Sequence, residues 1–249
     1  MRNIAIIVSE NNQSMNSKFF QALATATTFA GIVATSGVAN AASLTSSSST
    51  GFGLTNIIDS PLSVQKFDAS LGTLKSVKIE FAGDLLGTAR FENLSPSSTP
   101  VTVNLASNLG LKLNNQSLFA LNPQNSFNYQ VGASDGTLDF GGTSGQSVTG
   151  LSASQSDTKT YTDSQFLQSF IGGGNLEFLF SALAQSGVTG SGNMISSITT
   201  EAKAAIKVTY DYDELKSVPE PSAALGLGLI AGIGMLSKSK KTRLKMSTF

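Results

Sequence analysis

The middle of the chain repeats one pattern, in which apolar residues occupy every second position and polar residues lie between them. The clearest example is Val77, Ile79 and Phe81, which alternate with Lys78 and Glu80. Successive side chains of a β-strand point to opposite faces, so the alternation predicts a strand with one buried and one solvated face. A helix would need apolar residues every three or four positions. The alternation therefore restricts this region mainly to half-buried strands.

The same pattern recurs along residues 55–213, and turn-forming segments separate its occurrences. Gly83-Asp84, the Ser/Pro segment 93–100 and Asp135-Gly136 predict turns, and one or two helical turns are expected at 164–171. Seven to ten short strands joined in this way predict an all-β fold, an antiparallel β-sandwich. The segment 109–113 either continues the strand before it or forms a separate one. The expected strands are 77–81, 85–92, 101–105, 109–113, 118–121, 127–131, 176–180 and 202–213.

Two missing residue types limit the chemistry of the chain, which contains no cysteine and no histidine. Disulfides, thiolate chemistry and the Ser/His/Asp and Cys/His arrangements are excluded within this chain. The commonest general base and the commonest metal ligand are also missing. Charged residues make up only 13% of the sequence, whereas Ser, Thr, Gly and Asn are abundant. This composition is typical of an extracellular β-protein with many turns.

Charge is unevenly distributed although the formal net charge is zero. Residues 42–217 contain 9 Lys/Arg and 14 Asp/Glu, and the basic surplus lies in the two ends of the chain. Nucleic-acid binding requires a basic face, so the acidic central region argues against a nucleic-acid partner.

The N-terminal 41 residues have the features of a secretory signal peptide. A short basic region at Lys18 precedes an apolar, small-residue stretch at 19–38, and Ala39 and Ala41 form an A-x-A cleavage site. We expect export through the secretion translocon and signal peptidase cleavage after Ala41. Met15 is the better start of this signal. The residues before Met15 are then either an over-long gene model, which we favour, or an unusual n-region. The Ser/Thr-rich segment 42–54 is expected to be a linker without fixed structure.

The C-terminal segment 214–249 contains three features in order. A proline-rich motif is followed by an uncharged apolar run, 222–237, and then by a basic cluster within 238–245. The run is short for a bilayer core of about 30 Å, but it can span as a transmembrane helix if the lysines reach the headgroups. The positive-inside rule would then place residues 55–213 outside the cell. The motif comprises Val218, Pro219, Glu220 and Pro221, and the basic membrane stop comprises Lys238, Lys240, Lys241, Arg243 and Lys245.

The order of these features resembles the PEP-CTERM sorting signal of bacteria. The resemblance covers about 30 of the 249 residues, and 246–249 extend beyond the family pattern. It implies processing by an exosortase, a membrane-embedded protease, and a cargo that belongs to exopolysaccharide or biofilm systems. The alternative is an ordinary C-terminal membrane anchor.

A second resemblance covers 55–213. The segments 66–77, 172–175 and 205–212 look like the choice-of-anchor E domain, a bacterial surface module found with differing C-terminal anchors. This family implies no biochemical activity, so no site residues follow from it.

Acidic and aromatic residues are the remaining candidates for chemistry. Paired carboxylates hydrolyse glycosidic bonds and oxygen ligands bind Ca²⁺, but the spacing misses the EF-hand loop, and solvated turn residues are the preferred interpretation. Aromatic rings stack on sugars, although core packing is preferred for Tyr210 and Tyr212. We expect no catalytic residues, no metal site and no cofactor. The acidic candidates are Asp84, Asp135, Asp139, Asp157 and Asp163, and the aromatic candidates are Phe127, Tyr129, Tyr161 and Tyr210.

The sequence therefore predicts a non-enzymatic exported protein of the cell surface or extracellular matrix. An exosortase sorts it, and it associates with exopolysaccharide or biofilm. Its β-domain is either anchored outside the membrane or released after processing. The alternative function is a carbohydrate- or calcium-dependent adhesion module, and a hydrolase without histidine ranks last.

Overall fold

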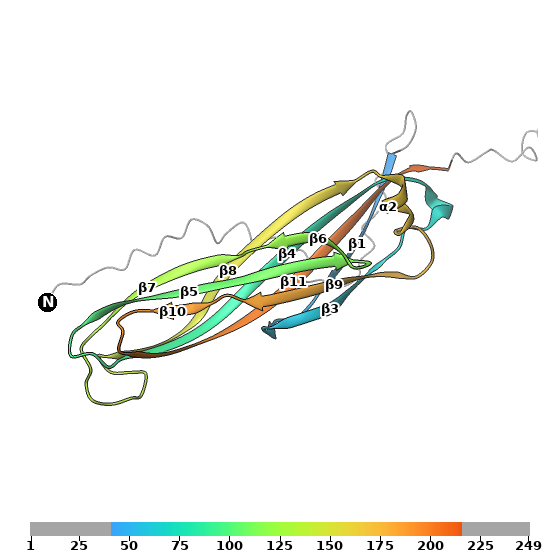
Figure 1. Cartoon of the computed structure of the whole chain (residues 1–249). Helices are drawn as coiled ribbons and strands as arrows, with labels where there is room; N and C mark the ends of the chain where they lie inside the picture. Colours follow the sequence, from blue (N-terminus) through green and yellow to red (C-terminus); the bar gives the residue numbers. More distant parts are fainter. Residues whose placement is uncertain (1–40, 216–249) are drawn as a thin grey trace, which may run out of the picture. The chain divides into compact units, whose positions relative to one another are not determined.

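A computed structural model describes residues 41–215 of the chain, which form an all-β, sandwich-like fold (Figure 1). Every strand ladder is antiparallel within the described residues, and a single isolated parallel bridge joins Phe67 to Ile171. The five-stranded sheet has the order β1-β11-β4-β8, and β2 also pairs with β11. The six-stranded sheet has the order β10-β5-β9-β3, and β6 and β7 also pair with β5. The five-stranded sheet contains β1 (Ala41–Ser49), β2 (Gly53–Leu54), β4 (Gly72–Asn93), β8 (Gly145–Tyr161) and β11 (Met194–Glu214). The six-stranded sheet contains β3 (Ile57–Gln65), β5 (Thr99–Leu113), β6 (Gln116–Leu121), β7 (Gln124–Val131), β9 (Asn175–Ala184) and β10 (Gly187–Thr189).

The strand β4 corrects one prediction, because the expected turn at Gly83-Asp84 lies in the middle of a continuous strand. Its ladder with β11 runs from Gly72, opposite Glu214, to Asn93, opposite Met194. A Cβ atom on Gly83 would overlap the side chain of Leu109 in the opposing sheet. Glycine is therefore needed at this position for close packing between the sheets.

The predicted strands 101–105 and 109–113 form one strand, β5, which changes its partners near Ser107. Before Ser107 it pairs with β7 and β10, and from Ser107 onward it pairs with β6 and β9. The predicted strands on either side of Pro123 are confirmed as β6 and β7. The helical turn expected at 164–171 is also confirmed, as α2 (Ser164–Gln168).

Two Ser/Thr-rich segments are strands that the sequence analysis assigned otherwise. The expected linker 42–54 contains β1, which pairs with β11 along its whole length, and β2. The strand β8, a region for which the sequence predicted no strand, pairs with β4. Both strands lie at edges of their sheet, where one neighbour supplies the backbone hydrogen bonds and few side chains must be apolar.

Apolar side chains from both sheets fill the space between them. Phe81 of β4 packs against Phe180 of β9 and Phe119 of β6, with ring centroids 6.3 and 5.6 Å apart. Side chains also join the sheets along their edges. The amide of Asn125 donates to the carbonyl of Ser152 at 3.1 Å. On the opposite side, the Gln65 backbone N–H donates to the Ser46 hydroxyl at 3.0 Å.

The chain divides into two compact units, Met1–Glu214 and Leu215–Phe249, and both sheets belong to the first. None of the helices in the described part of the chain is long and apolar enough to cross a membrane. The predicted transmembrane run 222–237 lies outside the described residues.

Candidate functional site

Most of the predicted sorting and processing residues lie outside residues 41–215 and stay predictions. Ala41 is the exception, because it is the first residue of β1, and its neighbour Ala42 is 5% exposed and pairs with Tyr212. Cleavage after Ala41 would therefore leave eight of the nine residues of β1 in the mature protein. The predictions that lie outside are Ala39, Val218, Pro219, Glu220, Pro221, Lys238, Lys240, Lys241, Arg243 and Lys245.

The acidic candidates occupy four separate places in the fold. Asp84 lies in the middle of β4 and Asp157 on the exposed side of β8, whereas Asp163 caps α2 by accepting the Phe166 backbone N–H at 2.9 Å. Asp135 and Asp139 share the loop between β7 and β8. Within residues 41–215, no group of three or more His, Cys, Asp or Glu side chains could by itself hold a metal ion.

The two loop aspartates shape their own loop. Asp135 accepts hydrogen bonds from the backbone N–H and the hydroxyl of Thr137, at 3.0 and 2.7 Å, and these bonds lower the pKa of its carboxyl. Asp139 accepts the Gly141 backbone N–H at 2.9 Å. Asp135 and Asp139 are therefore exposed turn residues, as predicted, whereas Asp163 is an exposed helix cap.

Asp84 departs from that interpretation because it is half-buried in a strand. Burial raises the pKa of its carboxyl to about 6, and the positive charge of Lys203 partly opposes this shift. A carboxyl with such a pKa can transfer protons near neutral pH. Asp84 lies opposite Ser154 of the neighbouring β8, and Asp157 lies opposite Phe81, so these two candidate acids are not paired across the strands.

The aromatic candidates contribute to packing. Tyr210 is fully buried and donates its hydroxyl to the Gln65 carbonyl at 2.7 Å. Phe67 contacts both Tyr210 and Tyr212, with ring centroids 5.9 and 5.0 Å apart. Tyr161 stacks on Phe166, with ring centroids 4.3 Å apart. Core packing is therefore confirmed for Tyr210 and Tyr212.

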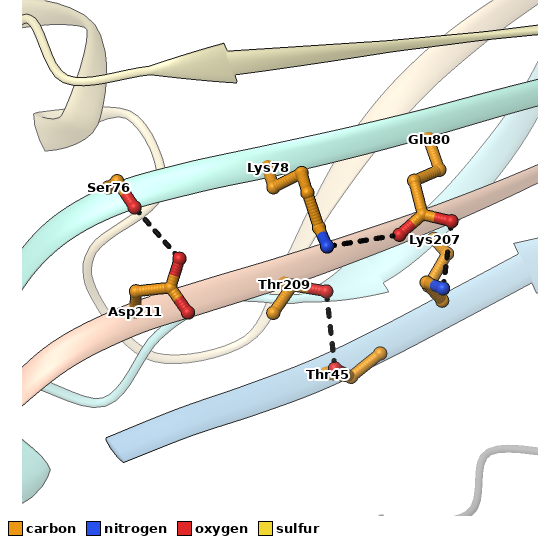
Figure 2. A network of polar contacts seen from close by, with 7 residues as sticks. All are labelled: Thr45, Ser76, Lys78, Glu80, Lys207, Thr209 and Asp211. Atoms are coloured by element: carbon orange, nitrogen blue, oxygen red, sulfur yellow. Dashed lines mark hydrogen bonds and ion pairs between the residues drawn. The ribbon is translucent and has the colours of Figure 1, made fainter. Parts of the chain in front are cut away.

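The outer face of the five-stranded sheet carries a polar network that crosses β1, β11 and β4 (Figure 2). Glu80 contacts the ammonium groups of Lys207 and Lys78 at 2.8 and 3.5 Å. The Ser76 hydroxyl donates to Asp211 at 2.9 Å. These side chains point outward at strand spacing and form hydrogen bonds and ion pairs across neighbouring strands. The hydroxyls of Thr45 and Thr209 extend the network to β1, at 3.3 Å.

Glu92, near the end of β4, is a fully buried carboxylate that the sequence pattern did not predict. Both of its oxygens lack hydrogen-bond partners among the described residues. The next residue, Asn93, is also buried, but its amide donates to the carbonyls of Ser97 and Gly132 at 2.8 and 2.7 Å. The alternation places Glu92 on the same face as exposed Arg90, so the sequence pattern alone indicates a solvated side chain. The loop between β7 and β8 buries it, and no sequence signal marks that contact.

Comparison with known proteins assigns no family. No family model and no curated protein matches the chain. Similar solved structures include the infectious bursal disease virus Gx strain, at 9% identity and a TM-score of 0.14, covering 85% of this chain and 56% of that chain. Another is a T=1 particle derived from infectious bursal virus, at 11% identity and a TM-score of 0.12, covering 74% of this chain and 47% of that chain. The chain thus spans about half the length of these viral chains, and likeness at such scores supports no conclusion about fold or function.

Proposed function

We propose that this chain is a non-enzymatic exported protein of the bacterial surface or extracellular matrix, sorted by an exosortase. One observation carries the proposal: Val218-Pro219-Glu220-Pro221, an uncharged apolar run and a basic cluster follow one another after the last strand. A transmembrane helix at 222–237 and a choice-of-anchor E-like domain at 55–213 belong to the same proposal. Association with exopolysaccharide or biofilm follows from the resemblance to PEP-CTERM proteins.

The placement of the signals around the fold supports this proposal. The strand β1 begins at Ala41, and β11 ends at Glu214, four positions before Val218. Cleavage at both predicted positions would therefore leave the two sheets nearly complete. The dispersal of the candidate acids favours a structural role over hydrolysis, and the polar outer face of the five-stranded sheet suits contact with a hydrated polymer.

The test is the intact mass of the protein recovered from its native host, with the exosortase gene present or deleted. The proposal predicts that residues up to Ala41 are removed in both strains. It also predicts that the segment from near Pro219 onward is removed only when the exosortase is present. An intact tail in both strains would contradict sorting and would leave an ordinary membrane anchor.

The second candidate function, a calcium-dependent binding module, is favoured by Glu92. A buried carboxylate with two unpartnered oxygens is an unusual feature in a folded protein, and it calls for a ligand.

A further inference from the structure

The carboxylate of Glu92 is buried at a high cost in free energy. Its residue has 0% exposure, and neither oxygen has a hydrogen-bond partner among the described residues. Removal of a charged carboxylate from water costs several kcal/mol unless other groups compensate. The side chain therefore calls for a partner that residues 41–215 do not provide.

The segment that covers Glu92 is the loop 132–144, between β7 and β8. Backbone hydrogen bonds close it onto β4 and onto itself: Gly132 N–H donates to the Thr143 carbonyl at 2.7 Å, and Asn93 N–H donates to the Ser144 carbonyl at 2.9 Å. A Cβ atom on Gly145 would overlap Oε2 of Glu92. The absence of a side chain at Gly145 thus creates the space that the carboxylate occupies.

The space at Gly145 is bordered by the carboxylate of Glu92 and by the main chain of the loop. The position of a Cβ on Gly145 lies 2.5 Å from the Gly141 nitrogen and 2.7 Å from the Phe140 carbonyl carbon, so Glu92 lies beside the peptide bond between these two residues. Asp139 accepts the N–H of the same peptide at 2.9 Å. The peptide that borders the space beside Glu92 is therefore held in place by Asp139.

No positive charge within the loop offsets these carboxylates. The segment 132–145 contains two aspartates and neither Lys nor Arg. On the neighbouring strand, the guanidinium of Arg90 lies over the Phe140 ring, 4.8 Å from its centroid. Hard divalent ions prefer carboxylate and carbonyl oxygens as ligands.

We infer that Glu92 anchors a calcium site beneath the loop 132–145, with the Asp139 carboxylate and main-chain carbonyls of the loop as further ligands. Calcium is favoured over magnesium because it accepts irregular sets of six to eight oxygens, including backbone carbonyls and bidentate carboxylates. The site explains the unpartnered oxygens of Glu92. It does not depend on export or on exosortase processing, so either proposal can fail without the other.

The experiment is calcium titration of the full-length chain after treatment with a chelator, followed by calorimetry and by thermal melting. We compare the wild type with Glu92→Gln, which keeps the shape of the side chain and removes its charge. The matched control is Glu177→Gln, since Glu177 lies exposed on β9. Calcium is expected to raise the melting temperature of the wild type and of the control by several degrees, and to leave Glu92→Gln unchanged. Magnesium is expected to have a smaller effect.

A second variant keeps the test decisive if Glu92→Gln fails to fold. Asp139 is exposed, so Asp139→Asn should fold, and we expect it to weaken calcium affinity about tenfold or more through the loss of a charged ligand. Wild-type protein that shows neither heat of binding nor a melting shift at about 10 mM calcium, well above the Kd typical of extracellular modules, would overturn the inference. Equal calcium affinity in the wild type and in Glu92→Gln would overturn it as well.

Discussion

The two ends of the long β4–β11 ladder are stabilised in different ways. We call the end near Gly72 and α2 the aromatic end, where Phe67, Phe170, Tyr210 and Tyr212 pack together. We call the end near Asn93 the loop end, which the segment 132–145 covers. Figure 1 shows α2 and this loop at opposite ends of the strands.

The two ends differ in whether their buried polar groups have hydrogen-bond partners. At the aromatic end the Tyr210 hydroxyl has a carbonyl partner, and burial raises the pKa of that hydroxyl. At the loop end Asn93 has its partners, whereas Glu92 has none among the described residues. A region that serves only stability satisfies its polar groups, so the exception at the loop end indicates a ligand.

The largest effect is expected from Phe67→Ala at the aromatic end. Phe67 is fully buried between two tyrosines, and its loss should reduce the free energy of unfolding by about 3–5 kcal/mol. The matched control is Phe52→Ala. Because Phe52 is 41% exposed, this substitution should reduce the free energy of unfolding by less than about 1 kcal/mol. Urea denaturation measures both values. Similar values for the two variants would show that the aromatic end is not a packed core.

A smaller effect is expected from Asn93→Ala at the loop end. The substitution removes the amide that binds the carbonyls of Ser97 and Gly132, and it should cost about 2–3 kcal/mol. The control is Asn128→Ala on exposed β7, which should change stability by less than about 0.5 kcal/mol. Urea denaturation again gives the comparison. A cost for Asn93→Ala as small as that of the control would mean that the loop is not fixed to β4 by this side chain.

Tyr210→Phe tests one hydrogen bond within the aromatic core. The ring stays in place, but the Gln65 carbonyl loses its hydroxyl donor at 2.7 Å, which should cost about 1–1.5 kcal/mol. Thermal melting with the same protein concentration and buffer measures the change. A variant as stable as the wild type would indicate that water replaces the hydroxyl at this end.

The smallest effect is expected from Asp84→Asn, midway between the two ends. The folded-state pKa of Asp84 is raised to about 6, so the folded protein binds the proton more tightly than the unfolded chain does. The penalty for ionising Asp84 is absent below about pH 4, and stability is lost as the pH rises toward about 6 and stays lost above it. Asp84→Asn should remove this loss and raise stability at pH 7 by about 1 kcal/mol, once solvent screening and the lost attraction to Lys203 are included.

Unfolding measured from pH 4 to pH 8 tests this expectation. The difference between Asp84→Asn and the wild type should grow between pH 4 and about 6 and remain constant above that value. A constant difference across the whole range would contradict a raised pKa.

The sequence predicted the strands whose burial depends on their own side chains. Alternation identified the regions of β4, β5, β6, β7, β9 and β11, because each strand places apolar residues on an inner face. It did not identify β1, because this Ser/Thr-rich edge strand is held by backbone hydrogen bonds to β11 and not by an alternating apolar face. It also misassigned Gly83, whose role depends on Leu109 in the opposing sheet. Contacts between distant segments decided these cases.

The same limit applies to the candidate site. Asp135 and Asp139 were recognised as turn residues because their hydrogen bonds are local. Glu92 was not recognised, because its burial results from a loop that begins about 40 positions later in the chain. The sorting signals were found readily, since they are linear motifs that an enzyme reads in an extended segment.

Hydrogen–deuterium exchange of the full-length chain with and without calcium tests the difference between the two ends most directly. We predict that calcium slows exchange at the amides of 132–145 and at Asn93, because a bound ion would suppress local opening of the loop. We predict little change in the amides around 66–72 and 164–172 at the aromatic end. Equal exchange at the loop end in both conditions, or slowing confined to the aromatic end, would contradict a calcium site under the loop.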